Sequence, residues 1–177
     1  TILISKGDKS DQLFVVLKGK LKVAITDASG KEIIMSFLGA GDYFGEMAMI
    51  DGESRSATIM TTQASEVLTI SRDDFHRTLL SSPDLMFELL KVLARKVRIA
   101  TDKLESLAFE DVYGRLVKLL IQLARPHDGV WIVEESLTHQ EIANMIGSSR
   151  EMVTRILKAL TSGSYISVDR KRITIKK

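Results

Sequence analysis

Cysteine is absent from the 177 residues of this sequence. Its absence excludes a disulfide framework, a thiolate metal site, a thiol redox sensor and a cysteine nucleophile. Only three histidines are present, His76, His127 and His139, and none of them pairs with another at the His-x-His or His-x3-His spacing of metal ligands. We therefore expect no bound metal, and any sensing function has to use another chemistry.

Long apolar runs are also missing. No apolar stretch reaches the ~18 residues that a membrane-spanning helix needs, and no signal-peptide pattern opens the chain. We expect a cytoplasmic protein that has no membrane partner. The chain begins at Thr1 rather than at a methionine, inside a strand-like run from Ile2 to Ile4, so we also expect part of the natural N-terminus to be missing.

The net charge is small, +2, but it is unevenly distributed. Thr138 to Lys177 contains eight Lys and Arg against three Asp and Glu, a local charge of +5, whereas the preceding residues contain 17 against 20, a local charge of −3. With 45% hydrophobic and 27% charged residues, the composition is that of a soluble globular protein of one or two domains. A basic C-terminal part on a mildly acidic body indicates that the C-terminal part contacts phosphate.

Short strands separated by turns are predicted from Thr1 to about Ile70. Runs of β-branched and aromatic or alternating residues cover Leu13–Leu17, Leu21–Ile25 and Ile33–Leu38. Glycines stand between or beside these runs, where turns with positive φ occur. Many short strands spaced by turns favour an antiparallel β-roll, similar to a jelly roll.

The apolar periodicity changes from strand-like to helical after Ser71. Pro83 is a helix-start signal, and Asp84–Ser106 contains neither Gly nor Pro while its apolar residues recur at three- and four-residue steps. A helix of this length cannot bury its apolar stripe against a small roll, so we expect it to pair with a second copy; an ordinary core helix is the alternative. A further helix is predicted over Val112–Leu123, followed by a break at 125–129 and a strand over Val130–Val133.

The segment from Leu137 to Leu157 has the pattern of a helix-turn-helix motif. Ala143 is small where the second helix packs on the first, and Gly147 follows four residues later where the tight turn needs positive φ. Val153 and Ile156 supply the apolar underside of the second helix. Because the small residue, the glycine and the apolar spacing occur together, the signal is specific.

Both helices of this motif have predicted N-caps. Thr138 and Glu141 stand three residues apart and form a capping box for the first helix. Ser148 or Ser149 can cap the second helix. The first residues of such a second helix face base edges in the major groove.

A short basic hairpin follows the motif. Ile166–Val168 and Arg172–Ile175 are strand-like and flank Asp169–Lys171. This pattern predicts a wing, whose cations neutralise phosphates without reading the base sequence.

The polar face of the second helix carries the residues that we assign to DNA. Arg can bind guanine through two hydrogen bonds and Glu can accept from the cytosine amino group, so Arg150, Glu151 and Arg155 are assigned to base reading. The alternative is an ordinary solvated face on which Glu151 and Arg155 form an i,i+4 ion pair. The full predicted DNA-binding set is Thr138, Ser149, Arg150, Glu151, Thr154, Arg155, Lys158, Arg170 and Lys171.

The segment from Phe44 to Thr58 resembles the phosphate-binding cassette of cyclic-nucleotide-binding domains. The resemblance assigns the Arg55 guanidinium to a cyclic phosphate, an anion that paired N–H donors can hold. It assigns Glu46 to the ribose 2′-hydroxyl, for which a carboxylate is a fixed acceptor, and Gly45 to a close approach of the backbone. Ser56 and Ala57 complete the predicted phosphate site.

With the long helix and the C-terminal motif, this cassette makes the whole chain similar to the cyclic-AMP receptor protein (catabolite activator protein) family. The resemblance implies a homodimer that binds cyclic AMP in the roll and against the long helix, and that repositions its DNA-binding domains about a hinge, here Leu107–Asp111. It places the adenine-contacting pair at Ala100 and Thr101, of which Ala100 lacks the hydroxyl group found in the family. It also implies a contact with RNA polymerase near Arg125–Trp131, where this chain is shorter.

The sequence therefore predicts an α+β protein with an N-terminal antiparallel β-roll, a long dimerisation helix with its hinge and a C-terminal winged helix-turn-helix, over residues 1–80, 81–108 and 109–177. The predicted function is a cyclic-AMP-gated transcription regulator that binds a specific double-stranded DNA sequence and has no catalytic residues. Two alternatives stay open. One is the same fold with cyclic di-GMP, cyclic GMP or no ligand; the other is a cupin-like metalloenzyme, for which the strand region lacks histidine ligands.

Overall fold

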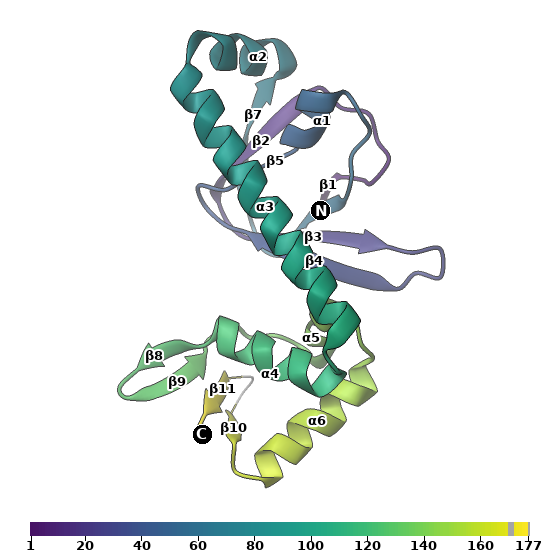
Figure 1. The fold of residues 1–177 in the computed structure, drawn as a ribbon, viewed down its shortest axis with the longest axis vertical. Coiled ribbons are helices and arrows are strands. Elements are labelled where there is room, and N and C mark those ends of the chain that lie inside the picture. The colour runs from purple at the N-terminus through teal and green to yellow at the C-terminus, as the bar shows by residue number, and fades with distance from the viewer. Residues whose placement is uncertain (170–171, 177) are drawn as a thin grey trace. The chain divides into compact units, whose positions relative to one another are not determined.

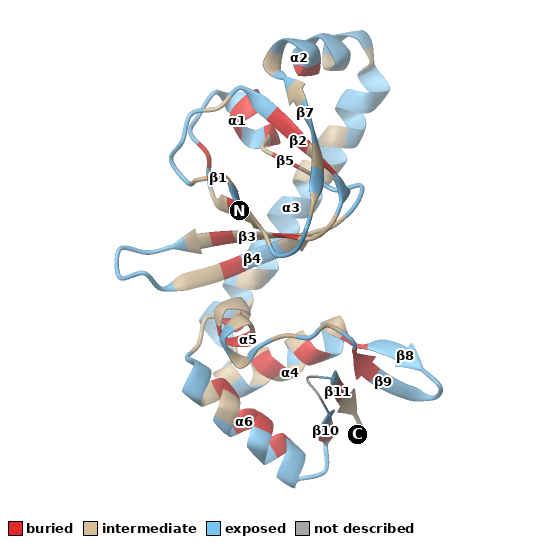
Figure 2. Cartoon of the chain, turned by 180° about the vertical axis from the view of Figure 1, so that it is seen from behind, coloured by how far each residue is buried: buried red, intermediate tan, exposed pale blue. Residues whose placement is uncertain are grey.

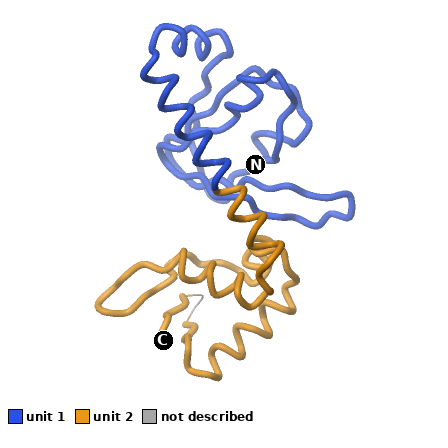
Figure 3. The backbone as a smooth tube through the Cα atoms, viewed as in Figure 1, with its two compact units in different colours: residues 1–98 blue, residues 99–177 orange. Residues whose placement is uncertain are grey.

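The chain divides into two compact units. The structure is a computed structural model that describes residues 1–169 and 172–176 (Figure 1). The first unit comprises Thr1–Arg98 and the second Ile99–Lys177 (Figure 3). No helix among the described residues is long and apolar enough to cross a membrane.

The first unit is an antiparallel β-roll, as predicted. Its two sheets have the strand orders β1-β6-β3-β4 and β5-β2-β7. The three strongest predicted strand runs correspond to β2, β3 and β4. The strands are β1 (Ile2–Ile4), β2 (Gln12–Lys18), β3 (Leu21–Thr26), β4 (Glu32–Leu38), β5 (Tyr43–Phe44), β6 (Thr58–Thr61) and β7 (Glu66–Ser71).

Apolar side chains from both sheets form the core of the roll. Phe14 of β2 and Phe44 of β5 stack with their ring centroids 4.9 Å apart, and Leu21 of β3 is completely buried. Ile4 of β1 and Ile59 of β6 join the same cluster from the four-stranded sheet. Leu13 and Phe14, neighbours on β2, are both buried but belong to different clusters, because successive side chains of a strand point to opposite faces of the sheet.

Two short helices interrupt or follow the strands of the roll. Helix α1 (Glu46–Asp51) lies between β5 and β6, and α2 (Arg72–Ser81) follows β7 directly. Neither helix was delimited from the sequence, and α2 was missed altogether. Ser71 caps α2 by accepting a hydrogen bond from the Asp74 amide, a local signal that was available in the sequence.

The long helix α3 (Pro83–Phe109) starts at the predicted proline but ends later than predicted. The predicted hinge, Leu107–Asp111, is therefore helical as far as Phe109. The chain leaves the helix at Glu110 because Asp111 caps the next helix, accepting a hydrogen bond from the Gly114 amide. No residue of α3 is buried (Figure 2).

The second unit is a winged helix-turn-helix, as predicted. Its sheet has the order β10-β11-β9-β8, and its core includes Leu116, Ile142 and Val153. The predicted break at 125–129 is wrong in part, because Arg125, Pro126 and His127 pair with β9 and form a strand. The elements are α4 (Val112–Leu123), β8 (Arg125–His127), β9 (Val130–Val133), α5 (His139–Ile146), α6 (Arg150–Ser162), β10 (Ile166–Asp169) and β11 (Arg172–Ile175).

Candidate functional sites

Arg55 and Glu46 are the two charged residues that are buried among the described residues, each with 3% of its surface exposed. Burying a charge is costly unless hydrogen bonds or an opposite charge compensate it. Both residues come from the segment that joins β5 to β6, on either side of α1. Their burial in one short segment makes this segment a candidate site.

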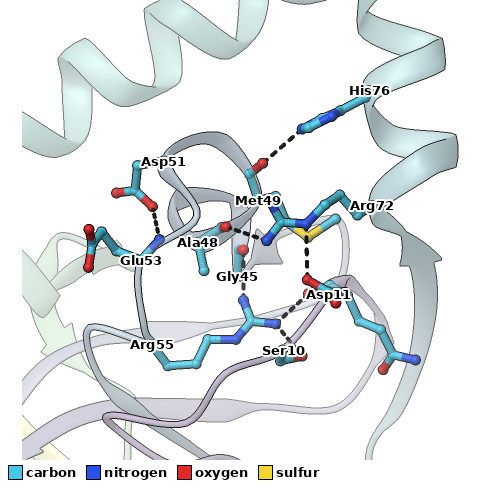
Figure 4. Close-up of polar contacts among 11 residues, drawn as sticks. Ser10, Asp11, Gly45, Ala48, Met49, Asp51, Glu53, Arg55, Arg72 and His76 are labelled. Carbon is cyan, nitrogen blue, oxygen red and sulfur yellow. Dashed lines mark hydrogen bonds and ion pairs between the residues drawn. The ribbon is translucent and has the colours of Figure 1, made fainter.

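The Arg55 guanidinium points into the protein and is held by three acceptors (Figure 4). Its Nη1 donates to the Gly45 carbonyl at 2.7 Å, and its Nη2 donates to Ser10 Oγ at 2.7 Å and to the Gln12 carbonyl at 2.6 Å. Nε is buried and has no hydrogen-bond partner among the described residues. Burial lowers the pKa of Arg55, and the charge of Glu46 acts in the opposite direction.

Gly45 is required by the backbone that precedes α1. Its φ is +88°, and a Cβ at this position would collide with Arg55 Nη1 and lie 3.1 Å from the Gln12 carbonyl oxygen. Only glycine adopts this conformation without strain and leaves room for the guanidinium. The structure thus places Gly45 beside Arg55, whereas its predicted approach to a ligand stays a prediction.

The Glu46 carboxylate is paired with Lys96 of α3. Lys96 Nζ lies 2.6 Å from Glu46 Oε1 and 5.4 Å from the centroid of the Tyr43 ring. Burial, together with the charge of Glu46, raises the pKa of Tyr43. Lys96 was not predicted from the sequence, because it lies 50 residues from Glu46 and no local pattern connects them.

The remaining predicted ligand residues differ in their surroundings. Ser56 is exposed and its hydroxyl lies 3.8 Å from Met47 Sδ, whereas Ala57 is partly buried next to it. Ala100 and Thr101 are exposed residues of α3 within the second unit. The structure does not test the assignment of these four residues, which stays a prediction.

The helix-turn-helix motif has the local geometry that its sequence predicts. Thr138 accepts from the Glu141 amide at 3.1 Å, and Glu141 Oε2 accepts from the Thr138 amide at 2.7 Å, which completes the capping box. Gly147 has a φ of +65° at the turn, and Ser149, rather than Ser148, caps α6. These features fix where α6 begins.

The polar face of α6 is exposed at Arg150, Glu151, Arg155 and Lys158. Thr154 is partly buried and its hydroxyl donates to the Arg150 carbonyl at 2.8 Å. Because that hydroxyl has one hydrogen, the Nδ1 of His139, which lies 2.8 Å away, donates to the Thr154 oxygen. His139 thus joins α5 to the exposed helix, a link that the sequence analysis missed.

The predicted phosphate contacts of the wing fall partly outside the described residues. Strands β10 and β11 pair in register from Ile166 with Ile175 to Asp169 with Arg172, so the hairpin itself is present. Arg170 and Lys171 lie outside the described residues. Thr138 and Ser149 are exposed at the starts of the two motif helices.

Comparison with known proteins matches both halves of the chain. The cyclic nucleotide-binding domain model matches residues 1–82, and the Crp-like helix-turn-helix domain model matches residues 114–177. The cAMP-activated global transcriptional regulator CRP of Salmonella typhimurium is 37% identical over 177 residues, which cover 98% of this chain and 84% of that protein. The CRP-like cAMP-activated global transcriptional regulator of Mycobacterium tuberculosis is 30% identical, over 98% and 79% of the two chains.

A solved structure has the same fold. The c-di-GMP responsive global regulator CLP of Xanthomonas campestris matches with a TM-score of 0.87 and 24% identity, over 100% of this chain and 90% of that one.

A β-roll followed by a winged helix-turn-helix is the architecture of a DNA-binding transcription regulator with a ligand-binding domain. Since both domain models and full-length relatives agree, the chain belongs to the cyclic-AMP receptor protein (CRP) family of transcription regulators. It is a cyclic-nucleotide-binding and DNA-binding protein, and it is a regulator rather than an enzyme.

Proposed function

We propose that this protein is a homodimeric transcription regulator whose affinity for a specific DNA sequence is gated by cyclic AMP. The observation that carries the proposal is the pair of buried charges, Arg55 and Glu46. A cyclic mononucleotide has a phosphate anion for the guanidinium and a ribose 2′-hydroxyl for the carboxylate. The relatives named cAMP-activated regulators support the choice of cyclic AMP.

Dimer formation is proposed from the apolar surface of α3. Leu90, Val97 and Leu104 stand seven residues apart and are 56%, 65% and 68% exposed. A seven-residue apolar repeat is the seam of a two-stranded coiled coil. In such a dimer each α6 faces one half-site, and the two half-sites lie about one helical turn of DNA, ~34 Å, apart.

DNA recognition is proposed for the exposed face of α6. Arg150, Glu151 and Arg155 would read base edges, and Lys158 together with Thr138 and Ser149 would contact the phosphate backbone. Thr154 would support this face through its bond to His139. Because the chromosome is the target, the protein would act in the cytoplasm.

A contact with RNA polymerase is proposed for the hairpin β8–β9. Val130 and Trp131 are 41% and 53% exposed on β9. An exposed aromatic residue is a common anchor of protein interfaces. In transcription assays, Trp131→Ala should lower activation while leaving operator affinity unchanged; equal loss of both would contradict a polymerase contact.

Cyclic GMP and cyclic di-GMP are the alternative ligands, because Ala100 cannot supply the hydroxyl expected for adenine and the choice of base is therefore open. Calorimetry with cyclic AMP, cyclic GMP and cyclic di-GMP on the full chain separates these ligands. We expect the tightest binding for cyclic AMP. Tighter binding of another nucleotide would leave the proposed regulatory function standing and would assign that nucleotide as the ligand.

The gating itself is tested on DNA. Duplexes selected by the protein from a random library are labelled and titrated with the protein, with and without saturating cyclic AMP. We expect cyclic AMP to strengthen binding, and Arg55→Leu to abolish both nucleotide binding and this response. Arg77→Leu, a surface arginine that is 75% exposed, is the matched control. Unchanged DNA affinity with and without nucleotide contradicts the proposal.

A further inference from the structure

Two arginines contact the same short loop of the roll, between β1 and β2. Arg55 Nη2 donates to Ser10 Oγ and to the Gln12 carbonyl at 2.7 and 2.6 Å. Arg72, the first residue of α2, donates from Nε to Asp11 Oδ1 at 3.0 Å, and its backbone amide donates to the Asp11 carbonyl at 3.0 Å. Figure 4 shows both guanidinium groups beside this loop.

The same two arginines also bind the two ends of the segment that carries Glu46. Arg55 Nη1 donates to the Gly45 carbonyl at 2.7 Å, just before Glu46. Arg72 Nη2 donates to the Ala48 carbonyl at 2.9 Å, just after it. The segment from Gly45 to Ala48 is thus tied at both ends to one loop.

We propose that Arg72 is a positioning residue of the nucleotide site, which holds Glu46 at a fixed spacing from Arg55 by bridging Asp11 and the Ala48 carbonyl. The inference rests on the proposed function, in which these two side chains bind opposite ends of one nucleotide. A ligand that must contact both groups binds more tightly when folding has already fixed their spacing. Loosening one tie therefore weakens binding without removing a ligand contact.

The geometry favours positioning over a charge effect. An isolated ion pair between exposed groups contributes little, and the Asp11 side chain is 79% exposed. The second acceptor is the carbonyl oxygen of Ala48, a buried residue of α1 with 3% exposure. The Arg72 guanidinium therefore joins the β1–β2 loop to helix α1. Burial and the charge of Glu46 have the larger influences on the pKa of Arg55. Of the two smaller influences, the charge of Arg72 lowers this pKa and the charge of Asp11 raises it.

Calorimetry with cyclic AMP on the full chain tests the role of Arg72. We expect Arg72→Met to raise the Kd about tenfold, the loss expected for one well-placed hydrogen-bonded tie. Arg72→Lys keeps the charge but cannot form the two-pronged bridge, so it should not restore affinity.

The control is Arg77→Met, on the same helix, which loses only a surface pair with Asp74 at 3.3 Å. It should bind like the wild type. A Kd for Arg72→Met within twofold of the wild-type value overturns the inference, as does wild-type affinity in Arg72→Lys. All variants are measured below the onset of their own thermal unfolding, so that lost stability does not pass for lost affinity.

A second measurement separates this inference from the proposed function. If the wild type does not bind cyclic AMP, the proposed function fails, and the positioning role is then tested in the ligand-free protein. Arg55 Nε–H is buried, and its hydrogen exchange can be followed by NMR. We expect Arg72→Met to speed this exchange several-fold and Arg77→Met to leave it unchanged. Unchanged exchange in Arg72→Met overturns the inference.

Discussion

Glu46 is a carboxylate that the fold removes from water and pairs with a single ammonium group. Lys96 reaches it from α3 at 2.6 Å while remaining 43% exposed itself. A bound ribose hydroxyl can donate to the same carboxylate, because each carboxylate oxygen accepts more than one hydrogen bond. The residue therefore has capacity for the ligand without losing its lysine.

The first prediction concerns this carboxylate. 2′-Deoxy cyclic AMP lacks the hydroxyl that Glu46 would accept, so we expect the wild type to bind it ~10-fold more weakly than cyclic AMP, the scale of a hydrogen bond to a charged group. In Glu46→Ala, calorimetry should find nearly equal affinities for the two nucleotides. Persistent discrimination in that variant would assign the hydroxyl to another residue.

At the scale of elements, the turn of the helix-turn-helix depends on one glycine, Gly147, which ends the first helix of the motif. Gly147 has a φ of +65°, and a Cβ there would lie 3.1 Å from Leu107 Cδ2. Two independent costs, a left-handed backbone and a close contact, therefore favour glycine at this position. Leu107, near the end of α3, therefore lies beside the turn that precedes α6.

The second prediction is that Gly147→Ala lowers the free energy of unfolding by more than the ~1–2 kcal/mol that a left-handed alanine costs, because the contact with Leu107 adds to it. Gly129→Ala is the matched control, since Gly129 has a φ of +82° but nothing within 4 Å of its Cβ position. Urea unfolding should show a larger loss for Gly147→Ala than for Gly129→Ala. An equal loss would mean that the contact with Leu107 adds nothing.

A second feature at this scale is the polar connection from α3 to α4. Glu110 accepts from Lys118 Nζ at 2.8 Å and from Ser106 Oγ at 2.6 Å. These bonds, with the one from Lys118 the stronger effect, lower the pKa of Glu110 below its ordinary value of 4.5. A carboxyl group whose pKa is lowered by folding stabilises the fold fully at pH values above its ordinary pKa. This stabilisation is lost as the pH falls through the lowered pKa.

The third prediction follows from that sign. Glu110→Gln should lower the Tm at neutral pH, and the difference from the wild type should shrink as the pH is lowered below 4.5. Lys118→Met should show the same trend, and the double variant should lose no more than either single one. Thermal unfolding followed from pH 7 to pH 3 provides the measurement. A difference that stays constant with pH would exclude the ion pair as its cause.

At the scale of the whole molecule, α3 is the helix whose apolar side chains stay exposed in a single chain. It is 27 residues long, and none of them is buried. We propose that a second copy of the chain covers this helix, because its seven-residue apolar repeat fits the seam of a coiled coil. Dimer formation would also supply the symmetry that a two-fold operator requires.

The fourth prediction is that Leu104→Glu converts the protein to a monomer and strongly weakens operator binding. A charge in a coiled-coil seam is desolvated without a partner, which disfavours assembly. Leu80→Glu is the matched control, since Leu80 is an 80% exposed leucine at the end of α2, outside the repeat. Sedimentation velocity reports the assembly state. A Leu104→Glu dimer of wild-type affinity would place the interface elsewhere.

The sequence by itself determined the features that depend on neighbouring residues. The capping box at Thr138 and the turn at Gly147 are each complete within a short stretch, so spacing and residue type were enough to find them. The cassette from Gly45 to Arg55 is also a local pattern, but it was identified by its resemblance to cyclic-nucleotide-binding domains. The same reasoning placed the roll, the long helix and the wing. It missed α2, and it ended α3 too early because it took 107–111 for a hinge.

Only the tertiary structure decided which distant residues complete the sites. Ser10 and Gln12 lie 45 and 43 residues from Arg55, and Asp11 lies 61 residues from Arg72. Such partners are brought together by strand register and by the packing of helices on sheets. A local pattern contains no information about either, because both depend on the burial of apolar side chains across the whole unit.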